Sequence, residues 1–274
     1  MAENAFVSWV CRLAHRVRIG HWPDIENPRS FNEKIMAFKL LQRDASYAPY
    51  VDKVAVKPIV ASLLGEDWVV PTLWHGTSLP QRRSWPLPYV LKANNSSGRN
   101  LFVRNADEED WPKIERRAKR WLETPHPRFK GEWLYTQIKP QLLVEPLMGD
   151  GSLPADYKFY VFEGRVQLIE HVSQRDTRYL CKLLDRDWQA VEGTIRNREN
   201  PQEVPRPEKL DELVWAAERL GAGFDFVRVD LYLVSGKPYF GELTFTPSAG
   251  VERYQPLALD YTLGDYWPWP SPAN

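Results

Sequence analysis

The chain has 274 residues, and its 36 lysine and arginine residues equal its 36 aspartate and glutamate residues. The formal net charge is therefore zero, so no global field attracts nucleic acid, and we expect no nucleic-acid partner. A composition of 43% hydrophobic and 26% charged residues is typical of a soluble globular protein and excludes disorder over most of the chain. Two cysteines and five histidines exclude a disulfide scaffold and a zinc-finger-type site.

Residues 6–19 have the pattern of a basic amphipathic helix. Phe6, Val10, Leu13 and Val17 recur at helical spacing, and arginines occupy the other faces. Two alternatives stay open: the helix docks on the protein's own body, or it attaches the protein to an anionic membrane. No apolar run approaches the roughly 18 residues of a membrane span, and residues 1–4 lack the basic start of a secretory signal. We therefore expect a cytoplasmic protein, with the inner face of the membrane as the alternative.

Helices and antiparallel hairpins alternate along the rest of the chain. Ser30 and Glu33 have the spacing of a capping box, which predicts the start of a helix. Further helices are predicted at residues 52–64, 110–122 and 210–220, a short strand at residues 68–74 and a buried strand at residues 141–147, and hairpins at residues 87–105, 157–172 and 224–245. Hairpins interleaved with helices predict an α+β fold rather than a doubly wound parallel sheet.

The last hairpin carries two carboxylates that could bind a metal ion. Asp230 and Glu242 fall on the same face if the turn at Ser235-Gly236 has an odd number of loop residues, whereas a two-residue loop would separate them. Adjacent carboxylates repel unless a cation neutralises them, and Mg²⁺ takes carboxylates together with substrate phosphates. The alternative is that Asp230 pairs with Arg228 on a wet sheet face.

Three other positions have a weaker functional signal. Lys92 ends an apolar strand just before Asn-Asn-Ser-Ser-Gly, whose backbone amides could wrap phosphate oxygens, although a solvated lysine is the alternative. Glu145 ends another strand, where its carboxylate and the backbone could bind the edge of an adenine ring. The alternative is an ordinary exit of the chain from the strand into a loop. Asp156 and Lys158 share one strand face and could form a surface salt bridge; with Arg175 they make a further charged set.

Taken in order, six segments of the chain resemble the ATP-grasp superfamily, and most closely its TupA-like branch, which is linked to cell-surface polysaccharide and teichuronopeptide synthesis. Their combination in this order is far more specific than any one of them. The segments are FNEKI (31–35), DKVAVKPIVASLLGEDWVVP (52–71), VLKANNSSGRN (90–100), LLVEPL (142–147), DYKFYVFEGRV (156–166) and VRVDLYLVSGKPYFGELTFTPSAG (227–250).

The resemblance implies a role for most of these polar residues. Lys53 and Lys92 match the lysines that contact nucleotide phosphates, and Lys158 resembles the basic strand residue near them. The phosphate-covering loop matches Ser96, Ser97 and Gly98, and the adenine-binding hinge matches Glu145 and Leu147.

The resemblance also implies the residues of the transferred phosphate and the metal. Arg175 resembles the arginine that stabilises the transferring phosphoryl group, and Asp230 and Glu242 match the magnesium carboxylates. Thr244 stands where most members have asparagine. A hydroxyl is a poorer ligand than an amide carbonyl, so a second metal ion is less certain than the first.

The fold and function implied by the resemblance are those of an ATP- and Mg²⁺-dependent carboxylate–amine ligase that works through an acyl phosphate on small-molecule acid and amine substrates. Two α+β lobes with antiparallel sheets are expected to grip the nucleotide, after a helical N-terminal region. The expected division is residues 1–85, residues 86–147 as the small lobe, and residues 148–274 as the large lobe. The alternative is a phosphoryl- or glycosyl-transferring enzyme of cell-surface polysaccharide synthesis.

Overall fold

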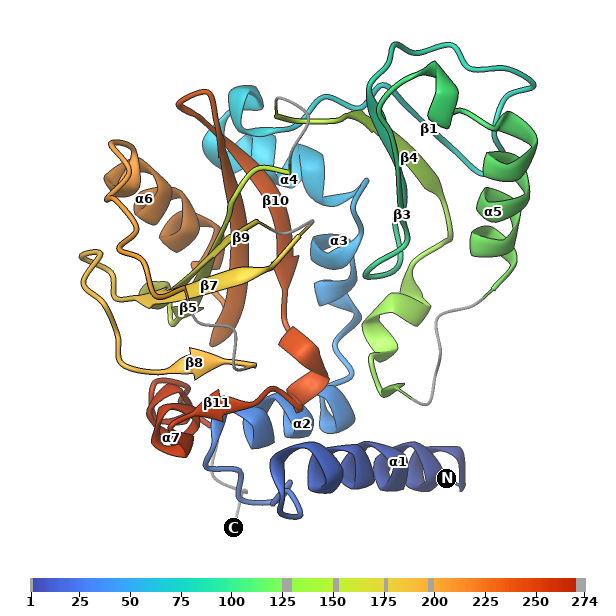
Figure 1. Ribbon diagram of the computed structural model, residues 1–274. Coiled ribbons are helices and arrows are strands. Elements are labelled where there is room, and N and C mark those ends of the chain that lie inside the picture. Colours follow the sequence, from blue (N-terminus) through green and yellow to red (C-terminus); the bar gives the residue numbers. More distant parts are fainter. Residues whose placement is uncertain (1, 125–129, 150–152, 175–176, 197–199, 270–274) are drawn as a thin grey trace. The chain divides into compact units, whose positions relative to one another are not determined.

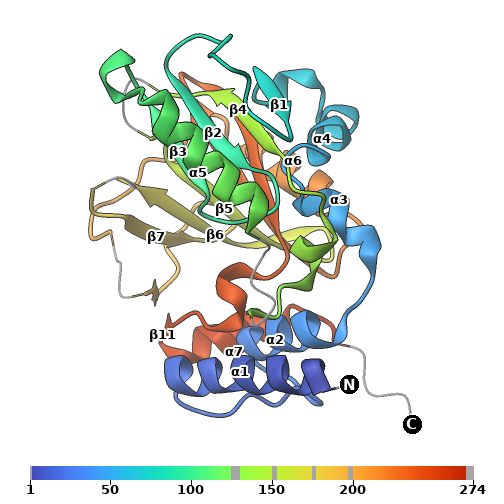
Figure 2. The same ribbon diagram turned by 90° about the vertical axis from the view of Figure 1, so that its right-hand side faces the viewer.

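The computed structural model describes residues 2–124, 130–149, 153–174, 177–196 and 200–269 (Figures 1 and 2). The chain folds into two compact units. Unit 1 consists of Met1–Arg43, Arg128–Glu132 and Pro154–Asn274, and unit 2 consists of Asp44–Pro127 and Trp133–Leu153. No helix in the described part of the chain combines the length and the apolar character needed to cross a bilayer.

Unit 1 is built on a five-stranded antiparallel sheet with the strand order β10-β9-β5-β6-β7. Helix α6 (Leu210–Gly221) packs against β9, β5 and β6 (Figure 1). The strands are β5 (Asp156–Phe162), β6 (Arg165–Ser173), β7 (Leu180–Leu184), β9 (Phe226–Val234) and β10 (Lys237–Thr244), and β8 (Thr194–Ile195) pairs separately with β11 (Tyr254–Gln255).

The N-terminal helices belong to unit 1 because α2 (Phe31–Leu41) is joined by buried polar contacts to α7 (Leu257–Asp265) and the residues after it. The Asn32 amide donates to Asp260 Oδ2 at 2.9 Å, and Lys34 Nζ donates to the carbonyl oxygens of Gly264 and Trp267 at 2.7 and 2.6 Å. The expected capping box forms at Ser30. The units thus differ from the expected ranges 1–85, 86–147 and 148–274, since partners of α2 lie more than 200 residues away.

Helix α1 (Ala2–Ile19) docks on unit 1 through a face other than the expected one. Cys11 and His15 are buried, and Cys11 packs against the core residues Ile25, Met36 and Ala37. By contrast Phe6 and Val17, assigned to the apolar face from the sequence, are 60% and 69% exposed. The assignment was wrong for these two residues, whereas Val10 and Leu13 are half-buried. The buried part of the contact is filled by the Cys11 thiol and by His15, whose ring lies 3.0 Å from the His21 carbonyl oxygen.

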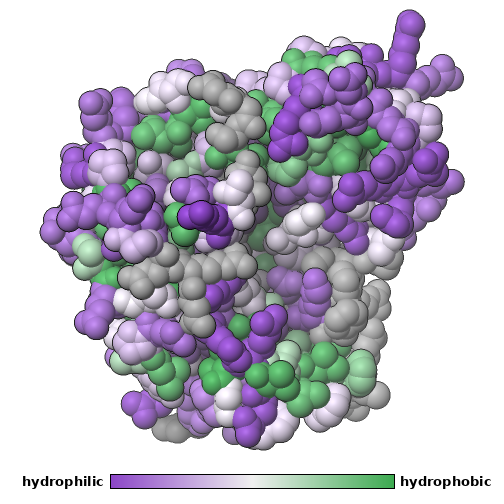
Figure 3. All heavy atoms as spheres, in the orientation of Figure 1, coloured by the Kyte–Doolittle hydropathy of each residue, from purple (hydrophilic) through white to green (hydrophobic). Residues whose placement is uncertain are grey.

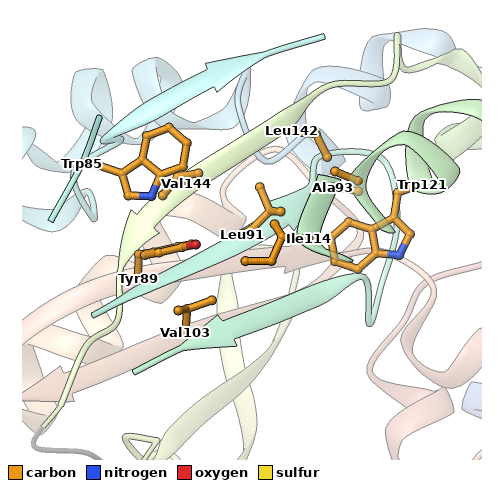
Figure 4. Close-up of a cluster of buried hydrophobic side chains, with 10 residues drawn as sticks. Trp85, Tyr89, Leu91, Ala93, Val103, Ile114, Trp121, Leu142 and Val144 are labelled. Carbon is orange, nitrogen blue, oxygen red and sulfur yellow. The ribbon is translucent and has the colours of Figure 1, made fainter. Parts of the chain in front are cut away.

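Unit 2 contains a four-stranded antiparallel sheet with the strand order β1-β4-β2-β3. Side chains of α5 (Trp111–Glu123) cover it: Ile114 and Trp121 lie beside Leu91 and Ala93 in a buried apolar cluster (Figure 4). The strands are β1 (Trp74–Gly76), β2 (Tyr89–Ala93), β3 (Asn100–Val103) and β4 (Leu142–Pro146), and the other helices are α3 (Ala48–Val51) and α4 (Val56–Leu64). Short 3₁₀ turns occur at Ala45–Tyr47, Glu66–Trp68, Ala106–Glu108 and Trp133–Gln137, and in unit 1 at η6 (Pro247–Gly250).

The two carboxylates of the β9–β10 hairpin lie on the same face because of a β-bulge and not because of the length of the turn. The turn of the hairpin is a two-residue loop, because Lys237 pairs with Val234. That loop alone would place Glu242 opposite Val229, on the face away from Asp230. A β-bulge at Gly241 shifts the register, so that Glu242 pairs directly with Asp230. Directly opposed residues share a face of the sheet, and the two carboxylates therefore lie side by side.

Glycine is required at the bulge because a larger residue would collide with β9. A Cβ atom at position 241 would lie 2.9 Å from the Asp230 carbonyl oxygen and 2.9 Å from the Tyr232 ring.

We expect Gly241→Ala to lower the free energy of unfolding by about 2 kcal/mol, because the backbone contact cannot be relieved by side-chain rotation. Urea unfolding followed by circular dichroism measures this. Wild-type stability in the variant would show that the bulge does not depend on the close approach.

Candidate functional site

In unit 2 the Glu145 carboxylate lies between two lysines. Lys57 Nζ is 2.5 Å from Oε1 of Glu145, and Lys92 Nζ is 2.5 Å from Oε2. The Glu145 side chain is 7% exposed, against 14% and 24% for Lys57 and Lys92. Two ammonium groups therefore converge on one buried carboxylate, and the lysines keep the more accessible positions. We call Lys57, Lys92 and Glu145 the lysine cluster.

Lys57 is the member of this cluster that sequence analysis missed. It lies in the first turn of α4, and its Nζ also donates to the Val70 carbonyl oxygen and to Thr72 Oγ1 at 2.8 and 2.6 Å. Lys92 and Glu145 come from the neighbouring strands β2 and β4. The available signal was the position of Lys57 four residues after Lys53, about one helical turn.

The lysines control the ionisation of Glu145. Burial raises the pKa of the carboxyl group, but Lys92 and Lys57 outweigh burial and hold the pKa of Glu145 below its ordinary value. The Leu147 backbone N–H donates to the Pro88 carbonyl oxygen at 3.1 Å. Both expected hinge residues are thus engaged within unit 2, Glu145 through its side chain and Leu147 through its backbone.

Asn94 anchors the loop that follows Lys92. Its side-chain amide donates to Asp52 and to the Lys139 carbonyl oxygen at 3.1 Å, and its Oδ1 accepts from the Gln141 N–H at 2.8 Å. Lys53 lies between α3 and α4, because α4 begins at Val56 and not at Asp52 as expected. Its Nζ donates to the Ser96 carbonyl oxygen at 2.8 Å. Lys53, Lys92 and Ser96 are therefore held in one unit, although the expected division placed Lys53 in another region.

The loop of residues 95–98 contains polar atoms suited to binding an anion. Asn95 and Ser96 are buried, yet Asn95 Oδ1 and Ser96 Oγ have no hydrogen-bond partner within the described residues. Ser97 and Gly98 are exposed. An unsatisfied buried hydroxyl is costly in the absence of a ligand, so the Ser96 hydroxyl fits a loop that binds phosphate oxygens.

In unit 1 a row of charged side chains crosses four adjacent strands. Glu242, Asp230, Lys158 and Glu170 are successive cross-strand partners on β10, β9, β5 and β6. Arg228 and Thr244 form the next pair on the same face of the β9–β10 hairpin. The sheet thus collects the expected metal residues and Lys158 on one face, although they come from segments far apart in the sequence.

Arg228 neutralises the carboxylates of the hairpin. Its guanidinium forms two hydrogen bonds of 2.7 Å to Asp230 and a third of 3.3 Å to Glu242 Oε1, and Thr244 Oγ1 lies 3.2 Å from both Arg228 and Glu242. The alternative pairing of Asp230 with Arg228 is therefore present, but not on a wet face: Asp230 is 3% exposed. Asp156 and Lys158, 4.0 Å apart, are also a largely buried pair rather than a surface one.

The ionisation of this cluster reflects burial opposed by charge. Burial raises the pKa of Asp230, and Arg228 and Lys158 oppose that shift. Burial and Arg228 disfavour the charged form of Lys158, but Asp230 and Glu170 outweigh them and raise the pKa of Lys158. We call these six side chains the hairpin cluster: Arg228, Lys158, Asp156, Glu170, Asp230 and Glu242. When all six are ionised, two are positive and four are negative, and the cluster has a net charge of −2.

The donor set suits Mg²⁺ bound jointly with a ligand rather than by the protein alone. In the described part of the chain, no group of three or more His, Cys, Asp and Glu side chains could hold a metal ion. Mg²⁺ commonly takes one or two carboxylates and completes its shell with phosphates and waters. Asp230 and Glu242 supply that number, and the Glu242 side chain is 37% exposed and accessible to an incoming ion. Arg175, expected near the transferred phosphate, lies outside the described residues.

A comparison with protein families identifies the family of the chain. A model of the TupA-like ATP-grasp family matches residues 33–267. The chain therefore belongs to the TupA-like ATP-grasp family, and the resemblance inferred from the six segments is confirmed. No curated protein matches the sequence.

Solved structures with similar folds include other ATP-grasp proteins. A D-alanine–D-alanine ligase from Bacillus anthracis complexed with ATP matches 72% of this chain and 53% of its own, with 15% identity and a TM-score of 0.43. An L-amino acid ligase from Bacillus licheniformis matches 80% of this chain and 50% of its own, with 14% identity and a TM-score of 0.47. The chain thus spans about half the length of the structures it matches.

The lysine cluster predicts how stability depends on pH. Because its folded pKa is lowered, Glu145 contributes stability that is present above its unfolded pKa of about 4.3 and is lost as pH falls through the folded pKa. We expect Glu145→Gln to lower the free energy of unfolding by about 3 kcal/mol at about pH 7, since it leaves two lysines without their carboxylate, and by less at about pH 4.

Urea unfolding at both pH values measures the difference. Glu123→Gln, which changes an exposed carboxylate on α5, is the control and should have little effect at either pH. A Glu145→Gln effect that is equal at both pH values would contradict the assigned charge.

Proposed function

We propose that the protein is an ATP- and Mg²⁺-dependent ligase that joins a small-molecule carboxylate to an amine through an acyl phosphate. Family membership supports the nucleotide chemistry. The single observation that carries the proposal is the bulge at Gly241, which places Asp230 opposite Glu242 on a buried sheet face. Arg228 and Lys158 offset only two of the four carboxylates of the hairpin cluster when all are ionised, so the remaining negative charge favours an added cation there.

The proposal assigns phosphate binding to unit 2. Lys53 and Lys92 contact the phosphates, Lys57 joins them as a third ammonium group, and Ser96, Ser97 and Gly98 cover them. Glu145 holds Lys57 and Lys92 in place through its carboxylate, and the segment from Glu145 to Leu147 borders the adenine. Multiple ammonium groups fixed before the nucleotide arrives supply charge neutralisation with little reorganisation.

The proposal assigns the metal and the transferred phosphoryl group to unit 1. Asp230 and Glu242 hold Mg²⁺, which lowers the charge repulsion between phosphate and carboxylate when bound, and Thr244 contributes a hydroxyl oxygen. Lys158 and Arg175 stabilise the charge on the transferred group. Phosphoryl transfer needs positioning and charge neutralisation more than a protein nucleophile, so the chain requires no catalytic serine, cysteine or histidine.

Product analysis separates this function from the alternative transfer reactions. The assay contains ATP, Mg²⁺, a panel of amino acids and uronic acids as candidate carboxylate substrates, and added amines. The ligase should release ADP and inorganic phosphate only when a carboxylate substrate and an amine substrate are both present. ADP with a phosphorylated product, or a released nucleoside diphosphate from a nucleotide sugar, would favour the phosphoryl- or glycosyl-transferring alternative. Phosphorus NMR and mass spectrometry distinguish these outcomes.

The phosphate role of Lys92 predicts weaker nucleotide binding on its removal. Lys92→Ala should weaken ATP affinity by about tenfold to a hundredfold, the effect of losing one charge-assisted contact of about 1.5 to 3 kcal/mol. Isothermal titration calorimetry measures the affinity. Lys113→Ala, which removes an exposed lysine on α5, is the control. Unchanged affinity in a folded Lys92→Ala variant would remove Lys92 from the site.

The metal role predicts a separation of folding from turnover. Asp230→Asn and Glu242→Gln keep the size of each side chain and should abolish most Mg²⁺-dependent turnover, whereas Thr244→Asn should be tolerated and could tighten metal binding. Because Arg228 loses a partner in Asp230→Asn, thermal unfolding must accompany each assay. Full turnover in both carboxamide variants would refute the metal assignment.

A further inference from the structure

Helix α1 exposes an apolar stripe on the side away from its docked face. Phe6, Trp9 and Val17 are 60%, 55% and 69% exposed, and their spacing of three and eight residues places them on one side of the helix. Trp22, just beyond the helix, is 56% exposed. Figure 3 shows hydrophobic residues, in green, gathered beside hydrophilic ones over the region in which Figure 1 draws α1. Large exposed apolar side chains clustered on one surface indicate an interaction site.

Within the segment that carries this stripe, the formally charged residues are all basic. From Ala5 to Trp22 the sequence contains Arg12, Arg16 and Arg18 and no aspartate or glutamate, although the whole chain has as many acidic as basic residues. Arg16 and Arg18 are exposed. The Arg253 side chain adds to this basic edge, since its Nε donates to the Arg18 carbonyl oxygen at 2.7 Å.

We propose that α1 is an interfacial helix that binds the surface of an anionic lipid bilayer. An apolar stripe that contains a tryptophan and is bordered by arginines matches the chemistry of the boundary between lipid headgroups and acyl chains. The stripe and Trp22 enter the headgroup layer, and the arginines contact lipid phosphates. Burial of Cys11 and His15 fixes the helix on unit 1, so the stripe is presented in helical form before binding.

The charge pattern favours lipid over a second copy of the chain. If two copies buried their stripes against each other, the arginines bordering the two stripes would approach with no acidic residue between Ala5 and Trp22 of either copy to pair with them. Like charges brought together in a partly buried interface are destabilising. An anionic bilayer supplies the missing negative charge.

Vesicle sedimentation tests the proposal. The wild-type protein should sediment with vesicles of equal parts phosphatidylcholine and phosphatidylglycerol, remain in solution with pure phosphatidylcholine vesicles, and dissociate as salt is added. Trp9→Ser should lower the partition coefficient at least about tenfold, because a large apolar side chain no longer enters the headgroup layer. Arg16→Gln should lower it about fivefold.

Matched changes on α6 are the controls. Trp215 is 51% exposed, similar to Trp9, and Arg219 is exposed like Arg16, so Trp215→Ser and Arg219→Gln should leave vesicle binding unchanged. Equal sedimentation of wild type and Trp9→Ser would overturn the proposal, as would equal binding to neutral vesicles. A lipid-free dimer in analytical ultracentrifugation that Trp9→Ser converts to monomer would also overturn it, in favour of self-association. Because no nucleotide is needed, the result is independent of the proposed ligase activity.

Discussion

The buried ion pair between Arg228 and Asp230 is the interaction on which the arrangement of unit 1 depends. Asp230 is 3% exposed and Arg228 8% exposed, so each charge would be costly without the other. Arg228 also reaches Glu242 and Thr244, and it therefore ties together the face of the hairpin that the bulge at Gly241 aligns. The carboxylates are held in position before any metal ion is bound.

Both clusters share this property of internal neutralisation. In unit 2 Glu145 forms ion pairs with two lysines, and in unit 1 Arg228 forms an ion pair with the Asp230 carboxylate. Under the proposed function, a phosphate entering the lysine cluster would compete with Glu145, and a magnesium ion entering the hairpin cluster would compete with Arg228. Such exchange keeps buried charges compensated both with and without ligand.

The sequence predicted the elements whose signals are local and missed features that depend on distant contacts. The capping box at Ser30 and the helix around Ile114 follow from short-range patterns, and both form. The six family segments also identified the family correctly. By contrast, the turn-length argument for Asp230 failed in its premise, because a bulge is set by contacts across the hairpin and not by loop length. The docked face of α1 was likewise misassigned, since its partners lie outside the helix.

Polar partners were the least predictable part of the site. Lys57 and Asn94 lie within the family segments 52–71 and 90–100, but their contacts with Glu145 and Asp52 form only in the folded chain. The central claim is that the bulge creates a metal site at Asp230 and Glu242. A crystal structure with Mn²⁺ in place of Mg²⁺ and a non-hydrolysable ATP analogue tests it through anomalous scattering. The account predicts a metal ion about 2.1 Å from oxygens of both carboxylates. Metal bound elsewhere, with both Arg228–Asp230 hydrogen bonds intact, would contradict it.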